Sequence, residues 1–278
     1  MCIRNYLSLL ALVFLLNACS PMPNDGIPVY VRIDSVELIT QAGQGGNSHF
    51  ISELWMESDA DNLGAYEYPV KIPVLREGEF PILAQAGVIM NGLSSIRYRY
   101  PFYFPDTVTV KAERGTVFYW TPRFRYKSGT VFALAEDFES TNFFTGGFDV
   151  VSSTADPLVR YGQNAGRIIV QPADSTKEVK QYSVMSVSNG GEVWGELDYY
   201  TELPITVGLY ITGNGQTVKY PKINFFPSEG KWKKVYINFS PEVNSYSGFT
   251  YQVYIEAINL QNSGGKVYFD NIKFLHFN

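Results

Sequence analysis

The chain has 278 residues, of which 45% are hydrophobic, 15% aromatic and 18% charged. This apolar content supports a substantial core and excludes a chain that is disordered over most of its length. The formal net charge of −5 and the lack of a basic stripe argue against nucleic acid as a partner. The 20 tyrosines, 19 phenylalanines and 24 glycines are typical of a β-sheet protein.

Residues 1–18 have the pattern of a secretory signal peptide. Arg4 places positive charge near the start, and residues 7–16 form an apolar run. At about ten residues, this run suits a signal peptide, whereas a membrane-spanning helix needs about 20. No apolar run of that length follows, so the sequence predicts no membrane-spanning helix in the remainder of the chain.

The stretch Leu16-Asn17-Ala18-Cys19 resembles the bacterial lipobox. This resemblance implies that Cys19 is acylated with palmitate-type chains and becomes the first residue of the mature protein. Two or more acyl chains hold a protein stably on a membrane. The other cysteine, Cys2, leaves with the signal peptide, so the mature chain is expected to contain no disulfide.

Residues 19–28 are expected to form an extended tether, because they contain three prolines. The expected location is the outer membrane of the cell envelope. Lipoproteins of the Bacteroidota type carry an acidic run after the cysteine that resembles a surface-export signal. Here Asp25 is the one acidic residue of the tether. The leaflet therefore stays open, with the periplasmic-facing side favoured.

Residues 29–127 are predicted to form a small β-sandwich, because short strands alternate with turn signals every 8–12 residues. The glycine-rich segment 40–48 is expected to be a flexible hairpin loop, and 58–64 a turn that lacks the ligands of a calcium loop. Segment 63–75 contains Pro69 and Pro73, which place it at a sheet edge or at a switch between sheets. Further strands are expected at 29–38, 51–57, 82–89, 94–100, 107–112 and 116–126.

The first domain resembles the small sandwich of Bacteroidota-type lipoproteins and Ig-like or carboxypeptidase-regulatory-like sandwiches. Leu63-Gly64-x-Tyr66, a proline-marked strand and Pro73-Val74-Leu75 carry this resemblance. Such modules share no single activity, so the resemblance implies a scaffold.

Residues 131–278 are predicted to form a second β-sandwich, after a composition shift near Lys127-Ser128-Gly129. Strands are expected at 166–171, 179–187, 195–200, 205–211, 231–239, 249–259 and 266–274. About eight antiparallel strands in such a length favour two packed sheets.

The second domain resembles the jelly roll of carbohydrate-binding modules. Three segments carry this resemblance: Asp137-Phe138-Glu139, the strand from Gly230 to Tyr236, and Val267-Tyr268-Phe269-Asp270-Asn271-Ile272. The fold class expected for the whole chain is therefore all-β, with two tandem β-sandwiches of which the second is a galactose-binding-like jelly roll.

The jelly-roll resemblance also implies a structural calcium where the first and last strands meet. Its ligands would be Glu136 or Glu139 together with Asp270, since Ca²⁺ prefers carboxylate oxygen. The alternative is that Asp270 caps a turn and Glu139 is solvated. No other cofactor is predicted.

A glycan site needs exposed rings on which a sugar can stack. The candidates are Trp194, Tyr199 and Tyr210, together with Tyr200. Because side chains alternate along a strand, Tyr199 and Tyr200 should face opposite sides. Trp232 occupies the position of a core tryptophan in the family.

The sequence carries no recognisable catalytic motif. Its histidines, His49 and His276, lie far from each other and from any cysteine that could complete a metal-ligand spacing. No nucleophile elbow, zinc-protease motif or phosphate loop is present. A glycosidase needs just two carboxylates, but acids are sparse in the strands of the second domain.

We therefore predict a non-catalytic, lipid-anchored envelope protein that binds a glycan or a protein through its jelly roll. An accessory subunit of an outer-membrane secretion or gliding assembly is the alternative, and a glycan-active enzyme is the third. A glycan binder should present a groove with two or more exposed rings. A docking subunit should present a flat or convex apolar patch.

Overall fold

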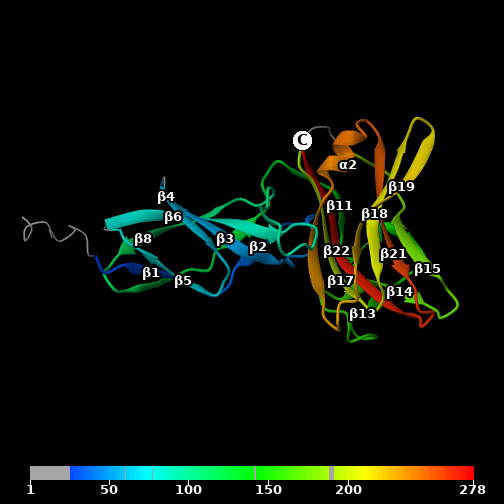
Figure 1. Ribbon diagram of the computed structural model, residues 1–278, viewed down its shortest axis with the longest axis horizontal. Helices are drawn as coiled ribbons and strands as arrows, with labels where there is room; N and C mark the ends of the chain where they lie inside the picture. Colours follow the sequence, from blue (N-terminus) through cyan, green and yellow to red (C-terminus); the bar gives the residue numbers. More distant parts are fainter. Residues whose placement is uncertain (1–25, 60, 77, 141, 188–190) are drawn as a thin grey trace, which may run out of the picture.

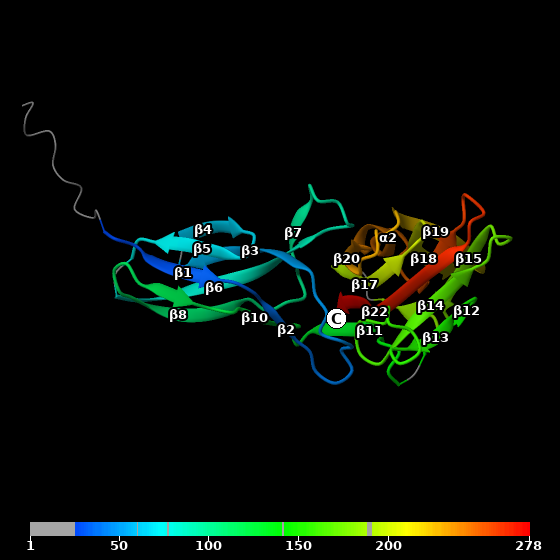
Figure 2. The ribbon, with the colours of Figure 1, turned by 90° about the horizontal axis from the view of Figure 1, so that it is seen from below.

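The computed structural model describes residues 26–59, 61–76, 78–140, 142–187 and 191–278, and its regular structure is almost entirely β-strand. Within these ranges the one helix is α2 (Ser240–Ser245). It is too short to cross a membrane. The expected signal peptide, Cys19 and most of the tether lie outside the described residues. The chain forms two all-β bodies placed end to end (Figure 1 and Figure 2).

The first body is a β-sandwich. A five-stranded sheet has the order β4-β3-β6-β7, with β8 also on β6, and the sheets β5-β1-β9 and β10-β2 complete the sandwich. Alternate side chains of β1 and β6 are buried in its core, which is the period expected of strands with one buried face. The strands are β1 (Val29–Ile33), β2 (Glu37–Ile39), β3 (Ile51–Ser58), β4 (Asp61–Tyr66), β5 (Val70–Val74), β6 (Gly78–Ile89), β7 (Arg97–Arg99), β8 (Asp106–Ala112), β9 (Val117–Tyr119) and β10 (Arg123–Arg125).

The proline-marked segment switches sheets, as its sequence predicts. Strand β4 ends one sheet beside β3, and β5 ends the other beside β1. Pro73 lies opposite Tyr30 on β5, where a residue without an N–H can be accommodated at a sheet edge. The turn before β4 is held by Arg76, whose guanidinium binds Asp59 and Asp61.

The glycine-rich segment 40–48 differs from the hairpin loop that its sequence predicts. The strands that flank it, β2 and β3, belong to different sheets, so the segment crosses between sheets. It also reaches the second body, where the carbonyl oxygen of Gly46 accepts a 2.7 Å hydrogen bond from Lys273 Nζ. Glycine suits this close approach, since a Cβ at Gly46 would lie 2.0 Å from Asn271 Oδ1.

The second body is a jelly roll of two antiparallel sheets. One has the order β13-β14-β22-β17-β20, with β11 also on β22, and the other has β12-β15-β21-β18-β19, with β16 on β21. The strands are β11 (Thr130–Glu136), β12 (Phe144–Gly146), β13 (Asp149–Ser152), β14 (Asn164–Val170), β15 (Thr176–Gln181), β16 (Met185–Ser186), β17 (Val193–Thr201), β18 (Ile205–Gly213), β19 (Gln216–Phe225), β20 (Lys233–Asn238), β21 (Thr250–Ile258) and β22 (Gly265–Phe277).

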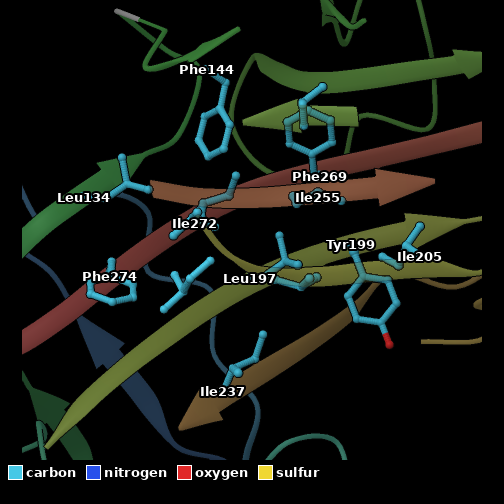
Figure 3. Packing of buried hydrophobic residues seen from close by; sticks show 14 of the residues in the cluster. Leu134, Phe144, Leu197, Tyr199, Ile205, Ile237, Ile255, Phe269, Ile272 and Phe274 are labelled. Atoms are coloured by element: carbon cyan, nitrogen blue, oxygen red, sulfur yellow. The ribbon is translucent and has the colours of Figure 1, made fainter. Parts of the chain in front are cut away.

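The core of the second body lies between its two sheets. Figure 3 shows Leu197 and Phe269 from one sheet gathered with Ile205 and Ile255 from the other. All four side chains are almost completely buried. Burial of each aliphatic or aromatic side chain of this size is worth about 1.5–3 kcal/mol relative to exposure. The tandem all-β architecture is thus as the sequence predicts.

Strand β19 has no counterpart among the predicted strands. Its sequence contains Lys219, Pro221 and Lys222, which favour a loop when the chain is considered alone. It lies at the sheet edge beside β18, and the register shifts where Pro221 faces Gly208. An edge strand with a bulge is where a sheet tolerates proline.

The two bodies share one continuous packed junction. Trp194, Tyr236 and Leu275 project from the outer face of a jelly-roll sheet into the core of the first body, and each is fully buried. The turn after β6 covers part of the β20 edge. There the Asn91 N–H donates 2.8 Å to the Tyr236 carbonyl, and the Asn238 N–H donates 2.9 Å to Asn91 Oδ1.

Candidate binding pocket at the junction of the two bodies

A pocket of about 540 Å³ lies where the first body meets the β20 edge of the second. The first body contributes its loop before β3 and its turn after β6. The second contributes the start of β20, parts of β17 and β19, and the loop between β13 and β14. The lining residues are His49, Phe50, Ile89, Gly92, Arg160, Tyr161, Tyr199, Phe225, Trp232, Lys233, Lys234 and Val235.

The pocket exists because the first body covers one half of β20. The turn after β6 of the first body pairs with Tyr236 and reaches Asn238, toward the end of β20. The residues from Trp232 to Val235, at the start of β20, line the pocket instead. On the other side the β13–β14 loop is fixed by Trp232, whose indole Nε1–H donates a 2.7 Å hydrogen bond to the Leu158 carbonyl.

Aromatic rings line the pocket from both bodies. Tyr199 stacks on Phe225 with ring centroids 5.0 Å apart, and Tyr161 meets Trp232 edge-on at 5.6 Å. Phe50, from the first body, is 49% exposed. An exposed phenylalanine beside other rings offers an apolar surface that a ligand can cover.

Beneath the pocket, two acids and a lysine form a buried ionic network. Lys234 Nζ lies 3.3 Å from Glu196 Oε2 and 3.6 Å from Asp198 Oδ2, and the three side chains are at most 3% exposed. Ser48 of the first body completes this group, since its hydroxyl contacts Asp198 and accepts from Lys234. Buried charges are tolerated when they are paired and hydrogen-bonded in this way.

The same network ties the first body to the second. The hydroxyls of Tyr100 and Tyr126, from the first body, donate to Glu196 Oε1 at 2.7 and 2.8 Å. Lys273, from β22, donates to the Tyr126 hydroxyl at 3.0 Å as well as to Gly46. The relative position of the two bodies is therefore fixed by directional, charge-assisted bonds inside a buried junction.

The charges in the network set one another's pKa values. Burial raises the pKa of Glu196. The charges of Lys234 and Lys273 and the hydrogen bonds from the two tyrosine hydroxyls lower it by more than burial raises it, so the pKa of Glu196 lies below its ordinary value. For Lys234, burial lowers the pKa, and the Asp198 and Glu196 charges outweigh burial and raise it. Burial lowers the pKa of Lys273 to about 8, despite the opposing charge of Glu196.

Trp194 is not available to a ligand, which corrects its selection as a stacking residue. Its side chain is fully buried at the junction, where it packs against Tyr98 and Tyr100 with centroids 5.5 Å away. The indole N–H donates to Glu192 Oε2 at 2.7 Å. The first body covers this part of the outward face of β17. The residue pattern of β17 alone does not show that another body packs there.

The three tyrosines that the sequence offers as sugar-stacking residues lie in three different parts of the second body. Tyr199 lines the junction pocket and is 6% exposed, and burial raises its pKa to about 12. Tyr200 packs with Trp232 and Tyr268 on the other face of the sheet, which confirms that Tyr199 and Tyr200 face opposite sides. Tyr210 lies on the second sheet, where its hydroxyl donates to Glu178 at 2.8 Å.

The three predicted calcium ligands do not fit a shared ion. No group of three or more His, Cys, Asp or Glu side chains within the described ranges could hold a metal ion. The Glu136 carboxylate accepts the backbone N–H groups of Phe138 and Phe143, and Glu139 Oε1 accepts those of Gln163 and Asn164. Both acids therefore hold loops.

Asp270, the third predicted calcium ligand, is a buried acid. Its Oδ1 accepts the Asn271 N–H at 2.6 Å, while its Oδ2 is buried without a partner among the described residues. Burial is the main reason that the pKa of Asp270 rises to about 9, and the charges of Asp198, Asp137 and Glu139 add to this. With no ion bound, this carboxyl therefore takes up a proton far more readily than an exposed aspartate does.

Sequence reasoning missed the pocket residues that lie in loops of either body. Phe50 follows the glycine-rich segment, and its exposure depends on how that segment docks onto the second body. Arg160 and Tyr161 lie in a loop without strand pattern. Trp232 was identified as a core residue; it is partly buried and also lines the pocket.

Searches with this chain find similarity to solved structures. No protein-family model and no curated protein sequence matches it. One similar structure is TmCBM61 in complex with β-1,4-galactotriose, at 15% identity and a TM-score of 0.33, over 51% of this chain and 95% of that one. Another is the CBM22-2 xylan-binding domain from Paenibacillus barcinonensis Xyn10C, at 14% identity and a TM-score of 0.38, over 51% and 98% of the two chains.

A third similar structure is a carbohydrate-binding module of the β-sandwich superfamily. It shares 11% identity at a TM-score of 0.39, over 81% of this chain and 86% of the other. Such low identities and TM-scores give no basis for transferring a ligand to this chain.

Proposed function

We propose that this protein is a non-catalytic glycan-binding protein and that the junction pocket is its binding site. The observation that carries this proposal is the lining of a pocket of about 540 Å³ by rings from both bodies: Phe50 from the first, and Tyr161, Tyr199, Phe225 and Trp232 from the second. Binding sites for small ligands commonly have volumes of about 300–1,000 Å³ and combine aromatic walls with a few polar groups. A sugar ring has apolar C–H faces that suit such walls.

The ionisable groups support a binding role over a catalytic one. Glycoside hydrolysis needs two carboxylates on either side of the scissile bond. The side chains that line the junction pocket include no acid, and the nearby Glu196 and Asp198 are buried and paired with Lys234. A sugar held in this pocket would meet rings, a histidine and cations.

We further propose that the protein is anchored to the outer membrane by lipid on Cys19, with the leaflet open and the periplasmic-facing side favoured. The described chain starts at the end of the first body that points away from the second (Figure 2). Six residues lie between Cys19 and Gly26, and the seven steps from one Cα to the next can span at most about 25 Å. Such an anchor would place the first body between the membrane and the pocket.

A glycan array with a soluble form lacking residues 1–19 tests the binding proposal. We expect the native form to bind a subset of glycans and Phe50→Ala to weaken that binding about tenfold, since one stacking surface is lost. Tyr119→Ala is the matched control, because Tyr119 is 72% exposed on the first body and does not line the pocket. Absence of binding across bacterial, plant and host glycans would favour the alternative, an accessory subunit of an outer-membrane assembly.

The anchor has a separate test. Cells given a labelled fatty acid should incorporate it into the native protein and not into a Cys19→Ser variant. Equal labelling of both forms, or labelling of neither, would contradict the proposed lipid.

A further inference from the structure

We infer that the junction pocket takes an acidic glycan, whose anionic substituent binds Arg160 and Lys233. This inference rests on the proposed function and names the class of glycan. The ionisable side chains that line the pocket are His49, Arg160, Lys233, Lys234 and two tyrosines, with no carboxylate among them. The whole chain carries a net charge of −5, so this pocket departs from the average charge of the protein.

Two of the lining cations have no acidic partner in the described part of the chain. Lys234 is neutralised by Glu196 and Asp198 and adds little net charge. Arg160 and Lys233, by contrast, are exposed and form no ion pair with a described residue. Their charges are therefore free to meet a ligand.

The two cations also stand next to the rings. The Arg160 guanidinium lies 5.7 Å from the centroid of Tyr161, and Lys233 follows Trp232 directly and is paired with Tyr199 across the strands. A sugar that lies against these rings would present its substituents to the cations. Arginine binds carboxylate or sulfate with two parallel hydrogen bonds, and lysine adds a point charge.

His49 contributes no positive charge at neutral pH. Burial and the neighbouring Lys234 lower its pKa below the ordinary value, although Asp198 and Glu196 oppose this shift. Selection of an anion therefore depends on Arg160 and Lys233. The shared chemistry is a negatively charged sugar substituent, either a uronic acid carboxylate or a sulfate ester.

Titration calorimetry with charge-matched sugars tests this inference. The soluble form lacking residues 1–19 is titrated with oligogalacturonate and with the same oligosaccharide after methyl esterification, which removes the charge. A second arm compares a sulfated galactan oligosaccharide with its desulfated form. We expect at least one acidic member to bind about tenfold more tightly than its neutral counterpart, because only the acidic sugar can form a charge-assisted hydrogen bond with the cations. The preference should decrease between low and high salt.

Variants connect the preference to the two cations. Arg160→Gln and Lys233→Gln should each reduce the ratio of acidic-sugar affinity to neutral-sugar affinity severalfold, because each removes one positive charge from the pocket lining. Lys231→Gln is the matched control, since it removes an exposed charge two residues from Lys233 and outside the pocket.

Equal affinity for charged and neutral sugars in both arms would overturn the acidic inference and leave glycan binding intact. Retention of the preference in both variants would overturn the assignment to Arg160 and Lys233. Absence of binding in both arms and across the glycan array would overturn the proposed function as well.

Discussion

The Tyr100 hydroxyl of the first body donates a 2.7 Å hydrogen bond to the Glu196 carboxylate of the second, inside a buried junction. Glu196 also receives a hydrogen bond from Tyr126 and lies beside Lys234. One carboxylate thus joins segments that are far apart in the sequence. Its removal affects both bodies together.

Glu196→Gln should destabilise the protein strongly. The amide keeps the shape of the side chain but leaves Lys234 with a weaker partner and removes the largest negative charge that acts on Lys273. Removal of one member of a buried ion pair costs about 3–5 kcal/mol. Chemical denaturation should therefore give a lower free energy of unfolding, with the exposed Glu229→Gln as the control. A loss below about 1 kcal/mol would show that the network contributes little to stability.

The two bodies should unfold in one cooperative transition. Trp194, Tyr236 and Leu275 belong to the second body by sequence but are buried against the first. Residues 131–278 expressed alone would expose these three side chains, so we expect a lower melting temperature or aggregation. Differential scanning calorimetry of the soluble form is the measurement. Two separate transitions, with the later one reproduced by 131–278 alone, would contradict this expectation.

Asp270→Asn should stabilise the protein in a pH-dependent manner. The pKa of Asp270 is about 9 when folded, against an ordinary value of 3.8, so the folded state binds more protons between these pH values. Stability contributed by this group is therefore present at low pH and decreases as the pH rises toward 9. Asparagine stays neutral, so its advantage over the native acid should grow from pH 4 to pH 9.

Melting curves across this pH range measure the effect. Asp34→Asn is the control, because its side chain is 56% exposed. A constant difference between Asp270→Asn and the native protein at all pH values would contradict the raised pKa.

Calcium should not change the stability of this protein. Glu136 and Glu139 are already engaged by backbone N–H groups, and within the described ranges no group of three or more His, Cys, Asp or Glu side chains could hold a metal ion. We expect the same melting temperature in calcium and in a chelator. An increase in calcium that disappears in Asp270→Asn would instead support the carboxylate site implied by the family resemblance.

Much of the fold follows from patterns within single strands. Alternation along 205–211 predicts β18, and the two prolines at Pro69 and Pro73 predict the sheet switch between β4 and β5. Strand β19 was missed because its residues alternate weakly and include Pro221. Its strand conformation depends on β18 as a neighbour and on a bulge, which are properties of the assembled sheet.

The pocket could be predicted less well than the fold. Tyr199 was selected from the sequence, but Phe50 and Arg160 lie about 110 residues apart and come together through docking of the two bodies. Trp194 was misassigned for the same reason, because the first body covers the face of β17 that would otherwise be exposed. A pattern within one strand carries no information about a second body that packs on it.

The buried bonds between Glu196, Lys234 and the tyrosines have a consequence for how a ligand is chosen. Opening a hinge at this junction would break the Tyr100 hydrogen bond to Glu196 and expose the buried side chains of Trp194 and Leu275 to water, so the gap between the bodies has its final width before any ligand arrives. Recognition then operates by fit to a preorganised gap, without an energetic cost of domain closure. If the pocket binds a glycan as proposed, chain thickness and branching, rather than an induced movement, decide which polymers can enter.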